Sequence, residues 1–298
     1  MMLNDWHKPV MCAEAIDCLK LKPGLTVVDA TIGTAGHASK ILEAIAPSGR
    51  LIGIDRDADS LAIAEENLKK YKNNFTLVHS DFRNIDKVLD SLNIGQVDGI
   101  LFDLGVSSYQ LDTKERGFSF RYDAPLDMRM DKTSYIAAYD LVNNLTEKEI
   151  SDILWSFGQE RWHNAIAKHL VRERLGAPVS TTAQLRDIVL KAIPHKFGRS
   201  RIHPATRTFQ ALRIAVNREL EALDEALSKV PRFLKKGGVI SVISFHSLED
   251  RIVKHNFKEL GQKGVYQVIT KKPITPEEDE IADNPRARSG KLRAARRR

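Results

Sequence analysis

A short apolar run that ends in an acidic residue, followed by a helical stretch, recurs along the first third of the chain. The runs are TVVDA with Asp29, RLIGID with Asp55, FTLVHSD with Asp81 and GILFD with Asp103. Runs of Val, Ile and Leu that alternate with helical segments such as 57–70 are typical of parallel strands joined by crossover helices. The sequence therefore predicts an α/β domain built on a mostly parallel sheet.

The next comparable run, GVISVISF at 238–245, follows only after a long gap. A gap of that length in a compact domain should contain structure of its own. Two capping boxes, one that begins at Thr146 and one that begins at Thr181, precede apolar residues at helical spacing.

We therefore expect an inserted all-helical domain at 112–207. The α/β domain would then be discontinuous and would consist of 1–111 and 208–298. Residues 286–298 would form a basic tail at its end.

The basic residues are unevenly distributed. Lys and Arg number 46 against 39 Asp and Glu, a net charge of +7, and the segment 286–298 alone holds seven basic residues and no acid. Seven more basic residues without an acid lie in 191–218. Such segregation favours a polyanionic partner, and nucleic acid is the commonest one. The alternative is a solvated tail and a basic helix face.

Disulfides, metals and membranes are not expected. The two cysteines, Cys12 and Cys18, have no neighbouring Cys or His and are interpreted as free thiols. The longest apolar run, at 135–139, is far too short to span a membrane, and the first ten residues do not resemble a secretion signal. We expect a soluble, cytoplasmic protein.

The expected strand ends indicate what kind of ligand could bind. Ligands of open parallel sheets bind beyond the carboxyl ends of the strands, where four acids are expected here. Clustered carboxylates would repel a pyrophosphate, but they suit a ligand with an ammonium, a sulfonium and ribose hydroxyls, such as S-adenosylmethionine. Any one of these acids could instead be a helix N-cap or an exposed loop residue; their joint placement favours the ligand.

The turn after the first strand, TIGTAGH at 31–37, lacks the G-x-G-x-x-G fingerprint, which argues against a nicotinamide oxidoreductase. Gly33 and Gly36 would allow a tight turn and a close approach of backbone to ligand. Asp55 would end the second strand, where an acid can accept hydrogen bonds from both ribose hydroxyls.

Several longer stretches, spread over nearly the whole chain, form a specific pattern. They are HKPVM at 7–11, DATIGTAGH at 29–37, DLGVSSYQLD at 103–112, RGFSF at 116–120, PLDMRMD at 125–131, HPATRTFQALRIAVNREL at 203–220, FHSLEDR at 245–251 and NPRARSGKLR at 284–293. In these stretches and in their order the chain resembles the MraW family, the bacterial ribosomal RNA small subunit methyltransferase H group.

Three positions depart from the pattern of the family. Ala35 stands where a glycine is common, and its methyl group could narrow the approach to the cofactor. Tyr109 replaces a frequent proline, and Gln159 replaces a usual glutamate. None of the three removes a group that the expected chemistry requires.

The resemblance implies a Rossmann-like methyltransferase domain that uses S-adenosylmethionine, with the helical insert for substrate recognition. It implies methylation of N4 of a decoding-region (P-site) cytosine in 16S ribosomal RNA, within the small ribosomal subunit. Carried over by position, the cofactor would contact Ala35, Gly36 and His37 in the turn, Asp55 at the ribose, Phe82 near the adenine, and Asp103 and Gln110 beside the reacting end.

The residues alone support part of this assignment. Asp55 and Asp103 are nominated by their positions at strand ends, whereas His37, Phe82 and Gln110 come from the resemblance. By composition, His37 is more often a capping or packing residue and Phe82 more often belongs to a core.

The expected chemistry needs orientation more than acid or base. Displacement of the methyl group by an exocyclic amine is accelerated by proximity, and Asp103 is the best acceptor for the N–H bonds of that amine. A dedicated base is not required. His246 could assist, but Ser247 and Asp250 fit a capping box there, which favours a structural role.

Two features could serve RNA binding. Aromatic and basic residues interleave at 116–122, although packing between the domains would explain them equally well. Arg129, Arg199, Arg201 and Arg207 are candidate phosphate contacts. Two other functions stay open, namely methylation of cytosine N4 in DNA and a non-enzymatic role as an RNA-binding assembly factor.

Overall fold

The computed structural model describes residues 8–71, 73–194 and 203–298. The described chain forms two compact units, one of residues up to Ser107 together with Leu220–Arg298 and the other of Ser108–Glu219. The helical unit thus starts before residue 112 and ends after residue 207. Its later end follows from helix α10 (Thr206–Asn217), which packs against helix α7 (Glu147–Gly158).

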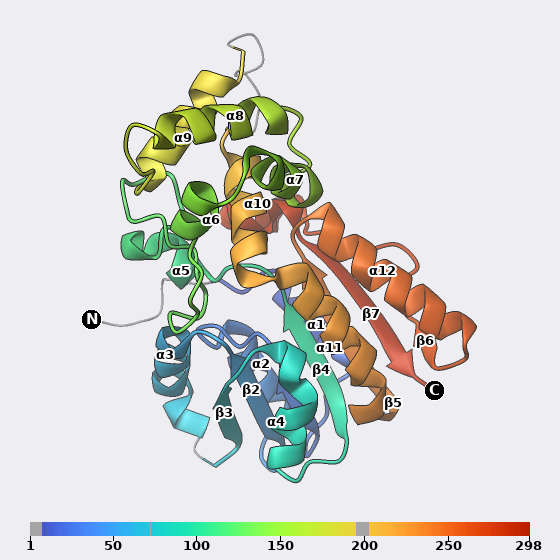
Figure 1. Cartoon of the computed structure of the whole chain (residues 1–298). Helices are drawn as coiled ribbons and strands as arrows, with labels where there is room; N and C mark the ends of the chain where they lie inside the picture. Colours follow the sequence, from blue (N-terminus) through green and yellow to red (C-terminus); the bar gives the residue numbers. More distant parts are fainter. Residues whose placement is uncertain (1–7, 72, 195–202) are drawn as a thin grey trace. The chain divides into compact units, whose positions relative to one another are not determined.

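The first unit is built on a seven-stranded sheet in the order β3-β2-β1-β4-β5-β7-β6 (Figure 1). The first five strands pair in parallel, and β7 pairs antiparallel with both β5 and β6. The expectation of an α/β fold is confirmed. The strands are β1 (Thr26–Asp29), β2 (Arg50–Asp55), β3 (Phe75–His79), β4 (Val97–Asp103), β5 (Leu234–Ser244), β6 (Tyr266–Val268) and β7 (Lys291–Arg297).

Both faces of this sheet are buried, which explains the continuous apolar runs in the sequence. Successive side chains alternate between two core clusters, as Leu101 and Phe102 of β4 do. Helices α4, α11 and α12 contribute to one cluster, and α1, α2 and α3 to the other. The helices of this unit are α1 (Cys12–Leu19), α2 (Gly36–Ile45), α3 (Ala58–Leu68), α4 (Ile85–Ser91), α11 (Glu219–Phe233), α12 (Ser247–Gln262) and α13 (Glu278–Asp283), with 3-10 turns η1 (Lys69–Tyr71), η2 (Phe82–Asn84) and η5 (Pro285–Ser289).

The expectation of a basic tail at 286–298 is wrong, because β7 lies inside the sheet between β5 and β6. Leu292 and the two alanines that follow Arg293 are fully buried. The Arg293 guanidinium lies 2.6 Å from a carboxylate oxygen of Asp250, and Lys291 is 3.8 Å from the same carboxylate. Part of the positive charge of this segment is therefore neutralised within the protein.

The second unit is helical. The expected capping boxes are present, since Thr146 and Glu149 begin α7 and Thr181 and Gln184 begin α9. Apolar residues at helical spacing, such as Ile150 and Leu154, are fully buried. Besides α7 and α10, the elements are α5 (Ser108–Asp112), η3 (Lys114–Arg116), α6 (Ala138–Asn144), α8 (His163–Arg174) and α9 (Thr182–Ala192).

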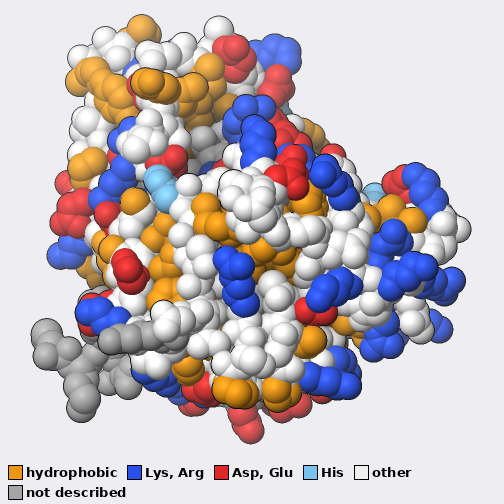
Figure 2. All heavy atoms as spheres, turned by 90° about the horizontal axis from the view of Figure 1, so that it is seen from below, with side chains coloured by type: hydrophobic (Ala, Val, Ile, Leu, Met, Phe, Trp, Pro, Cys, Tyr) orange, Lys and Arg blue, Asp and Glu red, His pale blue; other side chains and the backbone are white. Residues whose placement is uncertain are grey.

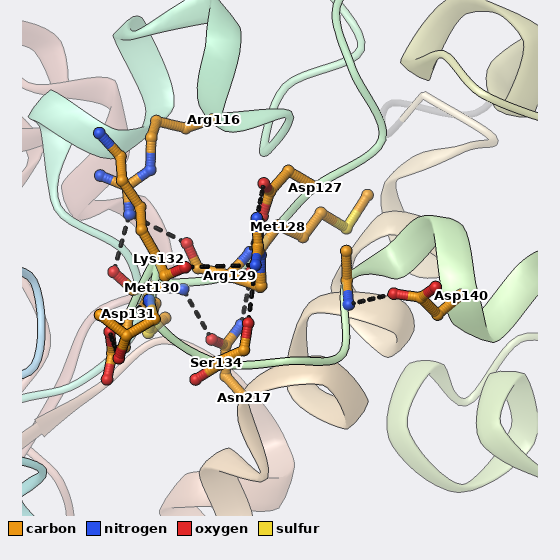
Figure 3. Close-up of polar contacts among 12 residues, drawn as sticks. Arg116, Asp127, Met128, Arg129, Met130, Asp131, Lys132, Ser134, Asp140 and Asn217 are labelled. Atoms are coloured by element: carbon orange, nitrogen blue, oxygen red, sulfur yellow. Dashed lines mark hydrogen bonds and ion pairs between the residues drawn. The ribbon is translucent and has the colours of Figure 1, made fainter.

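Arg116 of the RGFSF stretch is joined to the PLDMRMD stretch by hydrogen bonds in this helical unit (Figure 3). Buried Arg116 donates to the carbonyl oxygens of Arg129 and Met130 at 2.9 and 2.7 Å. The Asn217 amide donates to the Met128 carbonyl at 2.7 Å and accepts from the Met130 N–H at 2.8 Å. These bonds hold Met128 in a left-handed conformation, φ 63°, which is strained for a residue with a side chain.

A glycine is needed where this loop crosses the chain before it. Gly117 has φ 68°, and a Cβ atom there would lie 2.3 Å from the Pro125 carbonyl oxygen. The close approach of the two backbones explains why glycine stands at this position.

Candidate active site

Three carboxyl groups gather at the carboxyl ends of β1, β2 and β4. Burial raises the pKa of Asp29 to about 7 and that of Asp55 to about 6. Burial also raises the pKa of Asp103 well above its ordinary value, and the nearby charges of Asp29 and Glu249 add to that rise. The carboxyl groups at the strand ends are therefore poorly solvated, and each carries either a negative charge or a proton.

Asp81 does not belong to this group, so the expected row of four acids is corrected to three. It follows the end of β3 and caps η2 by accepting from the Arg83 N–H at 2.9 Å. Its carboxylate also pairs with the side chains of Arg56 at 2.9 Å and Arg83 at 3.3 Å. Because two guanidinium groups neutralise it, Asp81 contributes little negative charge to the strand ends.

The Asp103 carboxyl group has one partly open side. Its backbone N–H donates to Thr31 Oγ1 at 2.6 Å, which fixes the end of β4. Its Oδ1 atom is buried and has no hydrogen-bond partner within the described part of the chain. The side chain as a whole stays 17% exposed, so access is through the rest of the carboxyl group, which includes Oδ2.

His37 lies next to this carboxyl group, near the start of α2. Its Nδ1 atom is 3.5 Å from Asp103 Oδ2, and its Nε2 atom is 3.0 Å from the carbonyl oxygen of Val10. A carbonyl oxygen only accepts hydrogen bonds, so Nε2 must carry the hydrogen atom. The contact between Nδ1 and Asp103 Oδ2 is then favourable when one proton lies between these two atoms, on the ring or on the carboxyl group, because two facing lone pairs would repel each other.

Asp55 shapes the turn that carries His37. Its two carboxylate oxygens accept from the N–H groups of Gly33 at 2.8 Å and Asp57 at 2.9 Å. Gly33 adopts φ 51°, in the left-handed region. Each carboxylate oxygen has a second lone pair, so Asp55 can still accept hydrogen bonds from a ligand.

Ala35, rather than Gly36, adopts the second left-handed conformation of the turn, with φ 72°. Gly36 is the first residue of α2, and Ala35 is its N-cap. Ala35 is 1% exposed and belongs to a core cluster with Ala38 and Ile41. Its methyl group therefore packs into the protein.

The two remaining expected contacts lie on different units. Phe82 lies in η2 and packs edge-to-face on Phe102, with ring centroids 5.7 Å apart, so it borders the core. Gln110 is buried on α5, which belongs to the helical unit. Of these two residues, only Phe82 belongs to the same unit as the strand ends.

His246 has a structural role, but the capping box differs from the expected one. The N-cap of α12 is His246 itself, paired with Glu249, and not Ser247 with Asp250. Buried Glu249 accepts from the N–H groups of Phe245 and His246 at 2.8 and 3.3 Å. Besides Asp29, Glu249 is thus a second buried acidic group near Asp103, which sequence patterns missed because it sits inside a helix.

The amino-terminal residues also reach this site, which the sequence analysis did not foresee. Val10 contacts His37, and the thiol of Cys12 interacts electrostatically with Asp103 and Asp29. Burial is the largest cause that raises the pKa of Cys12, to about 11. Cys12 and Cys18 are both free.

The candidate RNA contacts are mostly engaged within the helical unit. Arg129 donates to both carboxylate oxygens of Asp127, at 2.8 and 2.7 Å (Figure 3). Arg207 donates to the carbonyl oxygen of Gln159 at 3.2 Å. Arg199 and Arg201 lie outside the described residues. On the face drawn in Figure 2, basic and acidic side chains both occur.

The interleaved aromatic residues contribute to packing. Phe120 stacks on His203 with ring centroids 4.6 Å apart and contacts Phe209 edge-on at 5.0 Å. The alternative interpretation, packing, therefore accounts for Phe120, although the contacts lie within one unit.

Two kinds of feature are absent from the described residues. These residues contain no group of three or more His, Cys, Asp or Glu side chains placed to hold a metal ion. They also contain no helix that is long and apolar enough to cross a membrane.

The sequence profile of the MraW methylase family matches residues 4–298. The chain belongs to the MraW methylase family. The ribosomal RNA small subunit methyltransferase H of Geotalea uraniireducens is 49% identical to this MraW-family chain, over 98% of the chain and 99% of the relative. The relative of the same name from Halothermothrix orenii is 47% identical over 98% of each.

The fold of this MraW-family chain is similar to a solved structure. The crystal structure of a candidate rRNA-methylase from Clostridium thermocellum superimposes with a TM-score of 0.50 and 16% identity, over 97% of this chain and 98% of the other. At that identity the likeness shows the fold alone. The expected family, the methyltransferase class and S-adenosylmethionine as its cofactor are confirmed by the family assignment.

Proposed function

We propose that this protein transfers a methyl group from S-adenosylmethionine to N4 of a decoding-region (P-site) cytosine in 16S ribosomal RNA. One observation carries the proposal: the chain matches relatives named ribosomal RNA small subunit methyltransferase H over nearly their whole length, at 47–49% identity. The protein would act in the cytoplasm, on RNA of the small ribosomal subunit.

The residues at the strand ends fit the cofactor. No Lys or Arg side chain forms an ion pair with Asp29 or Asp103 among residues 8–71, 73–194 and 203–298. Buried carboxylates without a cation are costly, and a positively charged ligand would relieve that cost. A negatively charged pyrophosphate would increase the cost. These carboxyl groups therefore favour a sulfonium compound over a dinucleotide.

We assign the cofactor contacts as the resemblance implies. Ala35, Gly36 and His37 would line the turn, and Asp55 would accept from the ribose hydroxyls through its remaining lone pairs. Phe82 would flank the adenine. Asp103 and Gln110 would lie beside the reacting end.

The chemistry depends on how Asp103 receives the amine. The bound cofactor supplies an electrophilic methyl group. The exocyclic N–H of cytosine would donate to the accessible side of the Asp103 carboxyl group, which orients the nitrogen lone pair for in-line attack. The methylated amine is acidic and loses its proton readily, so none of the side chains needs to act as a strong base.

Mapping of methyl groups tests the proposal. The wild-type protein is incubated with labelled donor and, in parallel, with small ribosomal subunits, protein-free 16S RNA, and single-stranded DNA that has the same base sequence as the target region. We expect one N4-methylated cytosine in RNA, located by mass spectrometry of nuclease fragments. Asp103→Ala should bind the donor but transfer methyl groups much more slowly.

Three results would contradict the proposal. Transfer to DNA alone would favour the DNA methyltransferase alternative. Methylation of another base or another atom would exclude cytosine N4. A protein that binds RNA but gives no heat in calorimetry with the donor would be an assembly factor.

A further inference from the structure

A segment at the start of the described chain, Lys8–Cys12, lies against the strand ends. We call this segment the amino-terminal strap. Its Val10 carbonyl accepts from His37 Nε2 at 3.0 Å. Burial, with the charges of Asp103 and Asp29 as smaller causes, raises the pKa of its Cys12 thiol. Val10 and Met11 are buried, at 4% and 0% exposure, so the strap is packed into the unit rather than resting on its surface.

The strap is held from the other side by the last helix of the sequence, α13. The Met11 N–H donates to Glu280 Oε1 at 2.6 Å, a contact that joins residues 269 positions apart. Met11 has φ 51°, a left-handed conformation that costs energy for a side chain other than glycine. A charge-assisted hydrogen bond to this N–H offsets that cost.

Two other contacts between α13 and the strap are weaker. The Lys8 ammonium lies 3.2 Å from Asp283, but both side chains are more than 70% exposed, at 71% and 73%. Exposed pairs contribute little to stability. Asn284 donates to the Lys8 carbonyl at 3.1 Å. Glu280 therefore makes the strongest of these polar contacts with the strap.

The strap determines the state of the His37 ring. Because the Val10 carbonyl requires a hydrogen atom on Nε2, the other ring nitrogen faces Asp103 Oδ2, 3.5 Å away. Without that carbonyl, the ring could take the other tautomer or rotate. The carboxyl group of Asp103 would then lose its contact with His37.

We propose that Glu280 is a positioning residue for methyl transfer, which acts through the strap and His37 on the orientation of the Asp103 carboxyl group. The chain of contacts runs from Glu280 Oε1 to the Met11 N–H, along the backbone to the Val10 carbonyl, then to His37 Nε2 and from His37 Nδ1 to Asp103. The inference rests on the proposed function, in which Asp103 receives the amine.

Three variants of α13 test this proposal. Glu280→Ala removes the acceptor for the Met11 N–H, whereas Glu280→Gln keeps an acceptor oxygen without the charge. Glu278→Ala removes the same charge from an exposed position on the same helix and serves as the matched control. Circular dichroism and melting curves establish that all three are folded.

We expect Glu280→Ala to lower kcat on the order of 10- to 100-fold, with little change in the KM for the donor, because misplacement of a reacting group acts on turnover. Glu280→Gln should recover most of the loss. Glu278→Ala should match the wild type. Equal kcat in Glu280→Ala and the wild type, or equal losses in Glu280→Gln and Glu280→Ala, would overturn the proposal.

A second measurement does not depend on methyl transfer. In ¹⁵N-histidine spectra of the donor-free protein, His37 should show a hydrogen atom on Nε2 in the wild type and in Glu280→Gln. Glu280→Ala should shift or broaden these signals. Unchanged His37 signals in Glu280→Ala would refute the positioning role even if the substrate proved not to be RNA, so the two proposals can fail separately.

Discussion

At the scale of single residues, the buried carboxyl groups make the fold sensitive to pH. The pKa of Asp29 rises from an ordinary 3.8 to about 7, so the folded protein holds this proton more tightly than the unfolded chain does. The stability that comes from this tighter proton binding is fully present below about pH 4 and is lost as the pH rises toward 7. We expect Asp29→Asn to be more stable than the wild type at pH 8, by up to about 4 kcal/mol, and equally stable at pH 4.

Denaturant unfolding of the donor-free protein at pH 4, 6 and 8 checks this expectation. Asp279→Asn, at an exposed position, is the control and should follow the wild type. Parallel stability curves for Asp29→Asn and the wild type would mean that Asp29 is ionised throughout.

Some residues of the site could be predicted from the sequence, whereas contacts between distant residues could not. Asp55 and Asp103 were predictable because each ends a locally recognisable apolar run. The contacts of His37 with Val10 and of Met11 with Glu280 join residues 27 and 269 positions apart, and no local pattern encodes them. The role of Ala35 was also missed, because its left-handed conformation turns the methyl group toward the core.

At the scale of elements, β7 is the clearest departure from the sequence-based prediction. Its sequence, KLRAARR, has four basic residues, two alanines and one leucine and lacks the Val and Ile typical of strands. The earlier strands could be predicted from their apolar runs. The strand forms because Leu292 and the alanines fill the core and Arg293 pairs with Asp250. In this segment, contacts with residues that are distant in the sequence thus outweigh a composition that does not favour a strand.

We expect Leu292→Ala to lower the free energy of unfolding by about 2–5 kcal/mol, since it leaves a cavity in a fully buried position. Arg298→Ala, just beyond the strand, should change it by less than about 0.5 kcal/mol. Chemical denaturation of both variants measures the difference. Equal, small effects would restore the interpretation of 286–298 as a solvated tail.

At the scale of the whole molecule, the division into two units predicts where the cofactor acts. The proposed donor contacts lie mostly in the unit that contains the sheet. At about 100 times its Kd the donor should stabilise that unit by about 2.7 kcal/mol. We expect slower hydrogen exchange in the strap and the turns after Asp29, Asp55 and Asp103, with little change in α7–α9. Mass spectrometry of peptic fragments measures the hydrogen exchange. Protection of α7–α9 equal to that of the strap and the turns would contradict the prediction.

The sheet unit is assembled from two stretches of chain that flank the helical insert. The first stretch supplies β1 to β4 with their carboxyl groups, and the second supplies Glu249, Glu280 and β7. A nascent or cleaved chain that has only the first stretch would lack both Glu280, which anchors the strap, and β5, the strand that pairs with β4. Such a fragment would not transfer methyl groups, so activity requires that both stretches of the chain have folded together.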